Sequence, residues 1–240
     1  MNSRLLHGKI CDTISVSKQR GIEMRSDTVK CIEENKLIVN MKGFSADMLL
    51  YSAEALIKGG IKAMEIPFIP AATEEKERES LLKIAALKKC FGKDIKVGAG
   101  NVFSDRLVKL AKGAGADFIS APNVNREVLS RADAVGVMPI AGGYTVSEIV
   151  SAADMGADFV ALYPTLNNLE YVTSITETLP QVRIMASGGV DYNNILALSK
   201  AGIKYFTAGG SLANVTLAEK QEFGIMEQEA KRYVELISKL

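Results

Sequence analysis

Short apolar runs alternate with longer amphipathic stretches along most of this 240-residue chain. Glycine marks the joints between them, in the similar motifs Gly60-Ile-Lys, Gly115-Ala-Asp-Phe, Gly156-Ala-Asp-Phe and Gly202-Ile-Lys-Tyr. A glycine that caps a helix and is followed by an apolar run predicts the step from helix to strand. The runs predict strands over residues 36–41, 61–66, 95–100, 116–120, 134–139 and 157–162. Two further strands are expected from about Arg183 and Ile203.

Between these strands, apolar positions recur at helical spacing and predict helices. The helices are expected over residues 45–58, 74–90 and 105–112, after Asn125 and from Ser147. Thr145-Val-Ser-Glu148 has the form of a capping box, and Asp105 and Asp191 are expected to cap the helices that follow them.

The alternation of strands and helices through short loops is typical of parallel strands joined by right-handed crossovers. Eight such units in a chain of this length predict a single (β/α)8 TIM barrel over residues 36–240. A doubly wound open sheet is the alternative, but no Gly-x-Gly-x-x-Gly motif follows the first strand. Residues 1–35 are interpreted as a short N-terminal extension that either covers the bottom of the barrel or contacts a partner subunit.

The composition narrows the class of function. A net charge of +1 without a basic block gives no support for a nucleic-acid partner, and no apolar run is long enough for a membrane span. The cysteines, Cys11, Cys31 and Cys90, are scattered and lack metal-ligand spacing, which favours a reduced, cytoplasmic protein. His7 is the only histidine, which excludes a His-based catalytic triad or a multi-histidine metal site within one chain. We therefore expect neither a metal nor a cofactor.

The last two strands end in small residues, Ala186-Ser187-Gly188-Gly189 and Ala208-Gly209-Gly210-Ser211. Glycines in this place let backbone N–H groups approach an anion, and the helix that follows adds its positive end. In (β/α)8 barrels the loops after the seventh and eighth strands frequently hold phosphate. We interpret the two motifs together as a phosphate site, and tight turns without a ligand are the alternative.

Other candidate residues lie where strands end, which is the catalytic end of such a barrel. Glu65 stands between Met64 and Ile66 in an apolar strand, so burial should raise its pKa and suit it to general-base catalysis. The alternative is a structural glutamate paired with a lysine. Lys42 is interpreted as a group that holds a carboxylate or phosphate, or as an amine nucleophile, against the alternative of a solvated lysine. Tyr144 and Tyr163 are each either a hydrogen-bond donor or a packing residue at the rim.

Several motifs, in their order and spacing, resemble a known family of enzymes. They lie at Gly59–Ile66, Val97–Val102, Ala114–Pro122, Thr145–Ile149 and Ala186–Val190. Together they resemble the 2-keto-3-deoxy-6-phosphogluconate (KDPG) and 4-hydroxy-2-oxoglutarate (KHG) aldolases, from about Lys36 to the C-terminus. The resemblance implies a trimeric lyase of carbohydrate metabolism that acts on a small, phosphorylated 2-keto acid.

The resemblance also implies roles for individual residues. Glu65 matches the proton-transferring glutamate, and Lys42 stands where the family usually has a substrate-binding arginine. The expected substrate-binding residues are Asn101, Pro122, Tyr163 and Ser187, of which Asn101 and Ser187 each replace a threonine. The resemblance implies phosphate-binding roles for Gly188, Gly189 and Ser211, and the glycine motifs described above add Gly209 and Gly210.

The chain also departs from the family pattern. Ala161, in Ala-Leu-Tyr-Pro164, occupies the place of the Schiff-base lysine, and alanine has no amine with which to form an imine. Ile69 stands where some members carry an arginine, and the stretch 139–145 is about two residues longer than usual. Three interpretations remain: Lys42 serves as the imine-forming amine, Glu65 serves an isomerase or epimerase, or the protein binds a phospho-ligand without catalysis. A metal in place of the imine is disfavoured, because too few ligands stand at the strand ends.

Overall fold

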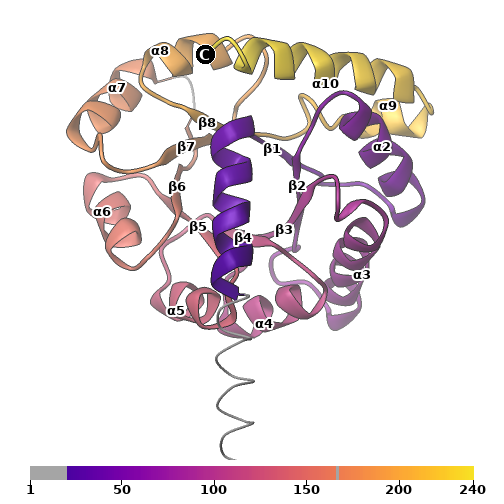
Figure 1. The fold of residues 1–240 in the computed structure, drawn as a ribbon, viewed down its shortest axis with the longest axis horizontal. Coiled ribbons are helices and arrows are strands. Elements are labelled where there is room, and N and C mark those ends of the chain that lie inside the picture. The colour runs from indigo at the N-terminus through magenta and orange to yellow at the C-terminus, as the bar shows by residue number, and fades with distance from the viewer. Residues whose placement is uncertain (1–20, 166–167) are drawn as a thin grey trace, which may run out of the picture.

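The structure is a computed structural model that describes residues 21–165 and 168–240, and its strands and helices alternate around a closed ring (Figure 1). The strands are β1 (Leu37–Asn40), β2 (Ala63–Pro67), β3 (Lys96–Gly100), β4 (Phe118–Ala121), β5 (Met138–Gly143), β6 (Phe159–Leu162), β7 (Ile184–Ser187) and β8 (Tyr205–Ala208). The named helices are α2 (Ala46–Lys58), α3 (Glu74–Phe91), α4 (Asp105–Gly113), α5 (Arg126–Val135), α6 (Val146–Asp154), α7 (Leu169–Thr178), α8 (Ile195–Lys200), α9 (Val215–Glu219) and α10 (Phe223–Ile237).

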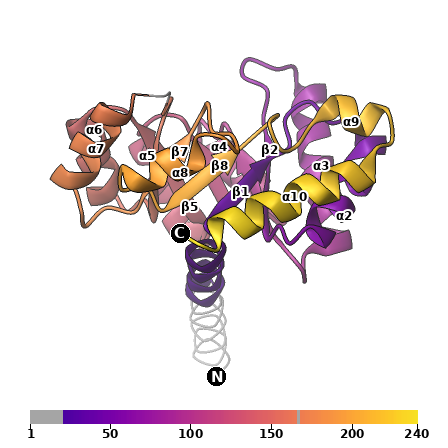
Figure 2. The same ribbon diagram turned by 90° about the horizontal axis from the view of Figure 1, so that it is seen from above.

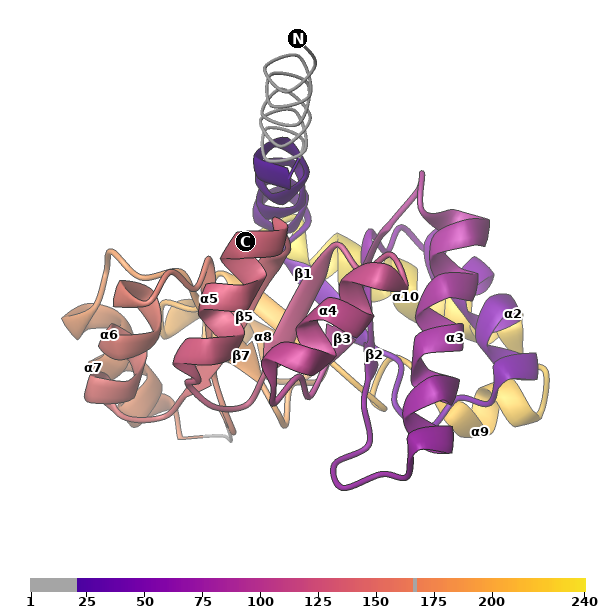
Figure 3. The ribbon, with the colours of Figure 1, turned by 90° about the horizontal axis from the view of Figure 1, so that it is seen from below.

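The strands form a closed parallel barrel in the order of the sequence, from β1 to β8. Closure is made by β1, which pairs with β8 on one side, Val39 opposite Ala208, and with β2 on the other, Asn40 opposite Glu65. The pairing of the first strand with the last excludes the open doubly wound sheet and confirms the TIM barrel. All carboxyl ends of the strands therefore open on one face, where the loop between β2 and α3 projects (Figure 3).

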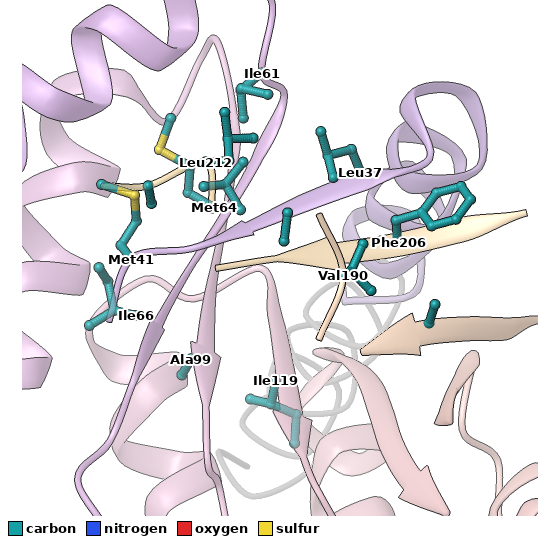
Figure 4. Packing of buried hydrophobic residues seen from close by; sticks show 14 of the residues in the cluster. Leu37, Met41, Ile61, Met64, Ile66, Ala99, Ile119, Val190, Phe206 and Leu212 are labelled. Atoms are coloured by element: carbon teal, nitrogen blue, oxygen red, sulfur yellow. The ribbon is translucent and has the colours of Figure 1, made fainter. Parts of the chain in front are cut away.

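Alternation along each strand divides the core into two layers. Leu37 and Val39 of β1 belong to the larger cluster, which lies between the strands and the surrounding helices (Figure 4). Ile38, between them, belongs to a second cluster that also contains Phe118 and Met185. Because successive side chains point to opposite faces of a strand, this second cluster fills the inside of the barrel. The inward position after Ile38 is Asn40, so the lining changes from apolar to polar toward the carboxyl ends.

The described part of the expected extension is a helix over residues 21–35 that lies across the N-terminal end of the barrel (Figures 1 and 2). Ile32 is fully buried and packs into the inner cluster, next to Ile38. Arg25 anchors the helix by donating to Asp158 Oδ2 at 2.7 Å and to Asp133 Oδ1 at 2.8 Å. This helix covers the bottom of the barrel, on the face opposite the expected site. His7 and Cys11 lie outside the described residues.

One expected strand is wrong in its limits. Residues 134–135 end helix α5, and the strand begins only at Met138 and continues to Gly143, through part of what we expected to be a loop. Asn125 starts the helix by accepting from the N–H groups of Glu127 and Val128, and Gly136 ends it in the left-handed conformation. Ala134 is exposed and Val135 is half-buried at this helix end. A run of so few apolar residues does not distinguish the end of a helix from a strand.

The helix caps agree with the sequence in part. The capping box of Thr145 and Glu148 at the start of α6 is confirmed. Asp105 is not a cap, because Ser104 precedes α4 and its Oγ accepts from Leu107 N. Asp191 accepts from two backbone N–H groups before α8, although the N-cap residue of that helix is Asn194.

Candidate active site

A pocket of about 470 Å³ opens at the carboxyl ends of the strands. Every residue that the sequence indicated for catalysis, substrate binding or phosphate binding lines it: Lys42, Glu65, Asn101, Pro122, Tyr163, Ser187, Gly188, Gly189, Gly209, Gly210 and Ser211. The pocket is also lined by residues that we did not select, among them Asn40, Ser120, Ile140, Ala161, Asp191 and Thr207. The barrel therefore gathers residues from most of its strands around one cavity.

Glu65 lies on the inner wall of this pocket with only 5% of its surface exposed. Its two carboxylate oxygens accept hydrogen bonds from two neutral side chains. Asn40 Nδ2 donates to Oε1 at 2.6 Å, and Ser120 Oγ donates to Oε2. Gly100 makes room for the group, since a Cβ atom at that position would lie 2.5 Å from Oε1. Among the described residues, β1, β3 and β4 thus enclose the carboxylate and none supplies a cation to it.

Burial determines the direction in which the pKa of Glu65 moves. Loss of hydration raises the pKa above its ordinary value of 4.5, and the hydrogen bonds from Ser120 and Asn40 oppose this rise without cancelling it. Glu65 makes no ion pair within the described residues, so the structural alternative of a lysine-paired glutamate is not what the geometry shows. A carboxyl group whose pKa is raised toward neutrality is suited to reversible proton transfer.

The glycine loops after β7 and β8 form another part of the pocket wall. Gly188 and Gly189 both have positive φ angles, 79° and 81°, and a Cβ atom at Gly188 would lie 3.0 Å from the ring of Tyr163. The backbone N–H groups of Gly188, Gly189, Gly210 and Ser211 donate no hydrogen bond to any described residue. Unoccupied N–H groups on two adjacent loops are the donors that an anion requires.

The helices that follow these loops contribute less than we expected. Helix α9 is only five residues long, and Asn214 Oδ1 accepts from the N–H groups of Thr216 and Leu217 at its start. Asp191 Oδ1 similarly accepts from the N–H groups of Asn193 and Asn194 before α8. Asn214 thus occupies donors in the first turn of α9, whereas the donors that Asp191 occupies precede α8. The loops themselves supply the free donors identified above.

Neither a metal cluster nor a membrane span is found in the part of the chain that the structure describes. Within residues 21–165 and 168–240, no group of three or more His, Cys, Asp or Glu side chains could hold a metal ion. None of the described helices is both long and apolar enough to cross a membrane. Cys31 and Cys90 are free.

Residues 29–228 match the family model described as KDPG and KHG aldolase. The chain belongs to this aldolase family. It is 27% identical over 200 residues to the 2-dehydro-3-deoxy-6-phosphogalactonate aldolase of Escherichia coli K12, which covers 82% of this chain and 92% of the relative. It is 32% identical to the 2-dehydro-3-deoxy-phosphogluconate aldolase of Treponema pallidum, over 66% of this chain and 72% of the relative. The solved structure titled "Native KDPGal structure" superposes with a TM-score of 0.74 at 26% identity, covering 85% and 96% of the two chains.

The amine groups of this aldolase-family pocket are few. Ala161, at the position where the resemblance places the Schiff-base lysine, lies in β6 opposite Gly142 and Met185 and is 7% exposed. Its side chain faces the pocket and the inner cluster. Lys42 follows β1 at the mouth and is the only lysine among the described residues that line the pocket.

Two residues that enclose Glu65 stood among the strand-end residues of the sequence but received no role in our selection. Asn40 ends the apolar strand β1 and Ser120 is the last but one residue of β4, and this polar interruption was the available signal. Asn101, which we did select, donates its Nδ2 to Phe68 O at 2.9 Å and thereby supports the loop after β2. Tyr144 does not line the pocket and stacks on Tyr171 with ring centroids 4.7 Å apart, in agreement with the packing alternative.

Proposed function

We propose that this member of the aldolase family is a lyase acting on a small, phosphorylated 2-keto acid, with Glu65 as the proton-transferring residue. The observation that carries the proposal is the Glu65 carboxylate itself, buried on the pocket wall with neutral partners only. A general base needs a carboxyl group whose pKa lies near the working pH, and burial without a cation moves the pKa in that direction.

The lining of the pocket supports the substrate class. The unoccupied N–H groups of Gly188, Gly189, Gly210 and Ser211 would hold the phosphate. Lys42, at the mouth, would hold the substrate carboxylate or react with the keto group. The relatives are named for 2-dehydro-3-deoxy sugar acid phosphates, which combine these groups. A homotrimer, as implied by the resemblance, and a cytoplasmic protein without a cofactor, as favoured by the composition, complete the proposal.

Aldol cleavage needs an electron sink, and in this pocket Lys42 is the amine that would supply one. The Lys42 amine would condense with the C2 carbonyl and release water to form an imine. Glu65 then takes the proton of the C4 hydroxyl, the C3–C4 bond breaks, and C4 leaves as an aldehyde. The electron pair of the broken bond neutralises the protonated imine, which becomes an enamine. Glu65 returns a proton to C3, and water releases the keto acid and the free amine.

Ala161 favours a second candidate, an isomerase or epimerase. Without a lysine on β6, Glu65 would remove a proton from the carbon beside the carbonyl and return it to a neighbouring position or to the other face. No carbon–carbon bond breaks in this reaction, so no imine is required.

Trapping with pyruvate and borohydride distinguishes these candidates. If the lyase proposal is correct, the intact mass of the wild type increases by one reduced pyruvate adduct, and Lys42→Ala abolishes the increase. Absence of the adduct, together with Glu65-dependent deuterium exchange into the C3 protons of pyruvate or a related keto acid, would favour the isomerase. Absence of both, with tight binding of inorganic phosphate, would contradict catalysis and leave a phospho-ligand-binding protein.

A further inference from the structure

Asn40 is the direct neighbour of Glu65 across two strands of the barrel. The pairing of β1 with β2 places it opposite Glu65, and its Nδ2 lies 2.6 Å from Oε1. Asn40 is the polar residue that ends the apolar strand β1. We propose that Asn40 is a positioning residue that fixes the orientation of the Glu65 carboxylate and favours its ionised, basic form. The catalytic consequence rests on the proposed function, whereas the effect on Glu65 does not.

The geometry leaves the carboxylate one orientation. Asn40 holds Oε1 from β1, and Ser120 holds Oε2 from β4. On the side of β3, a Cβ atom at Gly100 would lie 2.5 Å from Oε1 and 2.7 Å from Cδ, so the backbone there is already close to the group. Rotation of the carboxylate about its Cγ–Cδ bond would break both hydrogen bonds. Loss of Asn40 would leave Ser120 alone to orient it.

The donors are also the groups that favour the charged form. Hydrogen bonds to a carboxylate stabilise its ionised state, while burial opposes it. Lys42, after β1, and Asp191, after β7, are the other charged side chains that line the pocket within the described residues. On the strands packed against Glu65, Lys96 and Asp117 lie at the opposite, N-terminal ends, where Asp117 pairs with Lys88. Asn40 is therefore placed to decide over which pH range Glu65 is a base.

The test measures Glu65 directly in the ligand-free protein. The protein is labelled with ¹³C at the glutamate carboxyl groups, the NMR signal of Glu65 is assigned by its loss in Glu65→Gln, and its titration is followed with pH. Asn40→Leu removes the donor at similar volume, and Asn40→Asp changes a single atom but replaces the donor with a second acid. We expect the titration midpoint of Glu65 to move to higher pH in both variants, and farther in Asn40→Asp, where like charges repel.

Activity supplies the second readout. At pH values below the midpoint, the rate of deuterium exchange into pyruvate should fall about tenfold in Asn40→Leu, the loss expected for one hydrogen bond to a charged group. The rate should recover toward that of the wild type as the pH rises, which a merely structural defect would not produce. Thr207→Val is the matched control. Thr207 lines the same pocket, but its Oγ1 donates to Met185 Sδ, so the Glu65 midpoint should not move.

The outcomes separate this inference from the proposed function. An unchanged Glu65 midpoint in folded Asn40→Leu and Asn40→Asp would overturn the positioning role, even if the wild type exchanges pyruvate protons. A raised midpoint without any exchange in the wild type would overturn the proposed catalysis and leave the positioning role standing. Equal shifts of the Glu65 midpoint in Thr207→Val and Asn40→Leu would also overturn the positioning role. The shift would then reflect the polarity of the pocket and not the hydrogen bond from Asn40.

Discussion

Replacing Glu65 with glutamine should abolish activity and yet stabilise the folded protein at neutral and alkaline pH. Glutamine keeps the shape and the hydrogen bonds, because its oxygen accepts from Asn40 Nδ2 and its NH₂ group donates to Ser120 Oγ, whose hydroxyl can rotate. What it removes is the buried charge. If Glu65 is the proton-transferring residue, the exchange rate should fall by about 10²-fold or more.

The size of the stabilisation follows from the balance around the carboxylate. Burial of an ion costs several kcal/mol, and each hydrogen bond to a charged group returns about 1.5–3 kcal/mol. Two donors face Glu65, and its pKa is nevertheless raised, so burial outweighs them. We therefore expect a gain on the order of 1–3 kcal/mol for Glu65→Gln, and each kcal/mol corresponds to about 2–4 °C in Tm for a protein of this size.

The gain should depend on pH in a defined direction. Between the unfolded and folded pKa values of Glu65 the native state binds more protons than the unfolded chain, so the wild type loses stability as the pH rises through this window. Above the folded-state pKa of Glu65, the stability advantage of Glu65→Gln over the wild type should be complete. Below the ordinary pKa of 4.5, this advantage should vanish. Thermal or urea unfolding from pH 4 to 9 measures both limits.

A second buried carboxylate provides the control. Asp117 is also 5% exposed but pairs with Lys88 at 2.7 Å, so Asp117→Asn leaves an unpaired lysine and should lose stability at neutral pH. A Glu65→Gln variant that is less stable than the wild type at pH 8 would refute the reasoning. It would mean that the hydrogen bonds outweigh burial and that Glu65 anchors the fold.

Two other predictions concern the phosphate loops and the absent lysine. Gly188→Ala places a Cβ atom 3.0 Å from the Tyr163 ring at a positive φ angle. It should weaken the binding of phosphorylated ligands, measured by calorimetry, at least tenfold more than that of unphosphorylated ones. Gly156→Ala, with a similar φ angle and open space around the new Cβ atom, is the control, and equal losses for both ligand types would mean that Gly188 is only a turn residue. Ala161→Lys directs an amine into the pocket, where burial lowers its pKa. This variant should gain a borohydride-trapped pyruvate adduct even in a Lys42→Ala background, and failure to do so would show that position 161 does not reach the keto group.

Local sequence patterns were sufficient for the fold. The alternation of apolar runs and amphipathic stretches, with glycine at the joints, predicted the barrel, because hydrophobic periodicity and caps act within a few residues. The same reasoning failed at residues 134–135, where an apolar segment before Gly136 belongs to a helix. Within so short a run, the end of a helix and a strand have the same composition.

The candidate site was predictable wherever the type of a residue at a strand end indicated its chemistry. Glu65 did so by its charge in an apolar strand, and the glycine motifs did so by repeating after consecutive strands. Because all parallel strands of a barrel open on one face, these residues had to meet in one pocket.

Only the tertiary structure decided how these residues are partnered. Glu65 is contacted from three different strands, by Asn40, Gly100 and Ser120. The strand register that brings these residues together cannot be predicted from the sequence. The same is true of the phosphate loops, where Asn214 occupies the helix donors and leaves the loop N–H groups free. The sequence by itself determined the alternation of strands and helices and the position of the acid, since both are local properties of the chain. The surroundings of that acid depend on barrel closure, which places residues distant in sequence within hydrogen-bonding distance of one another.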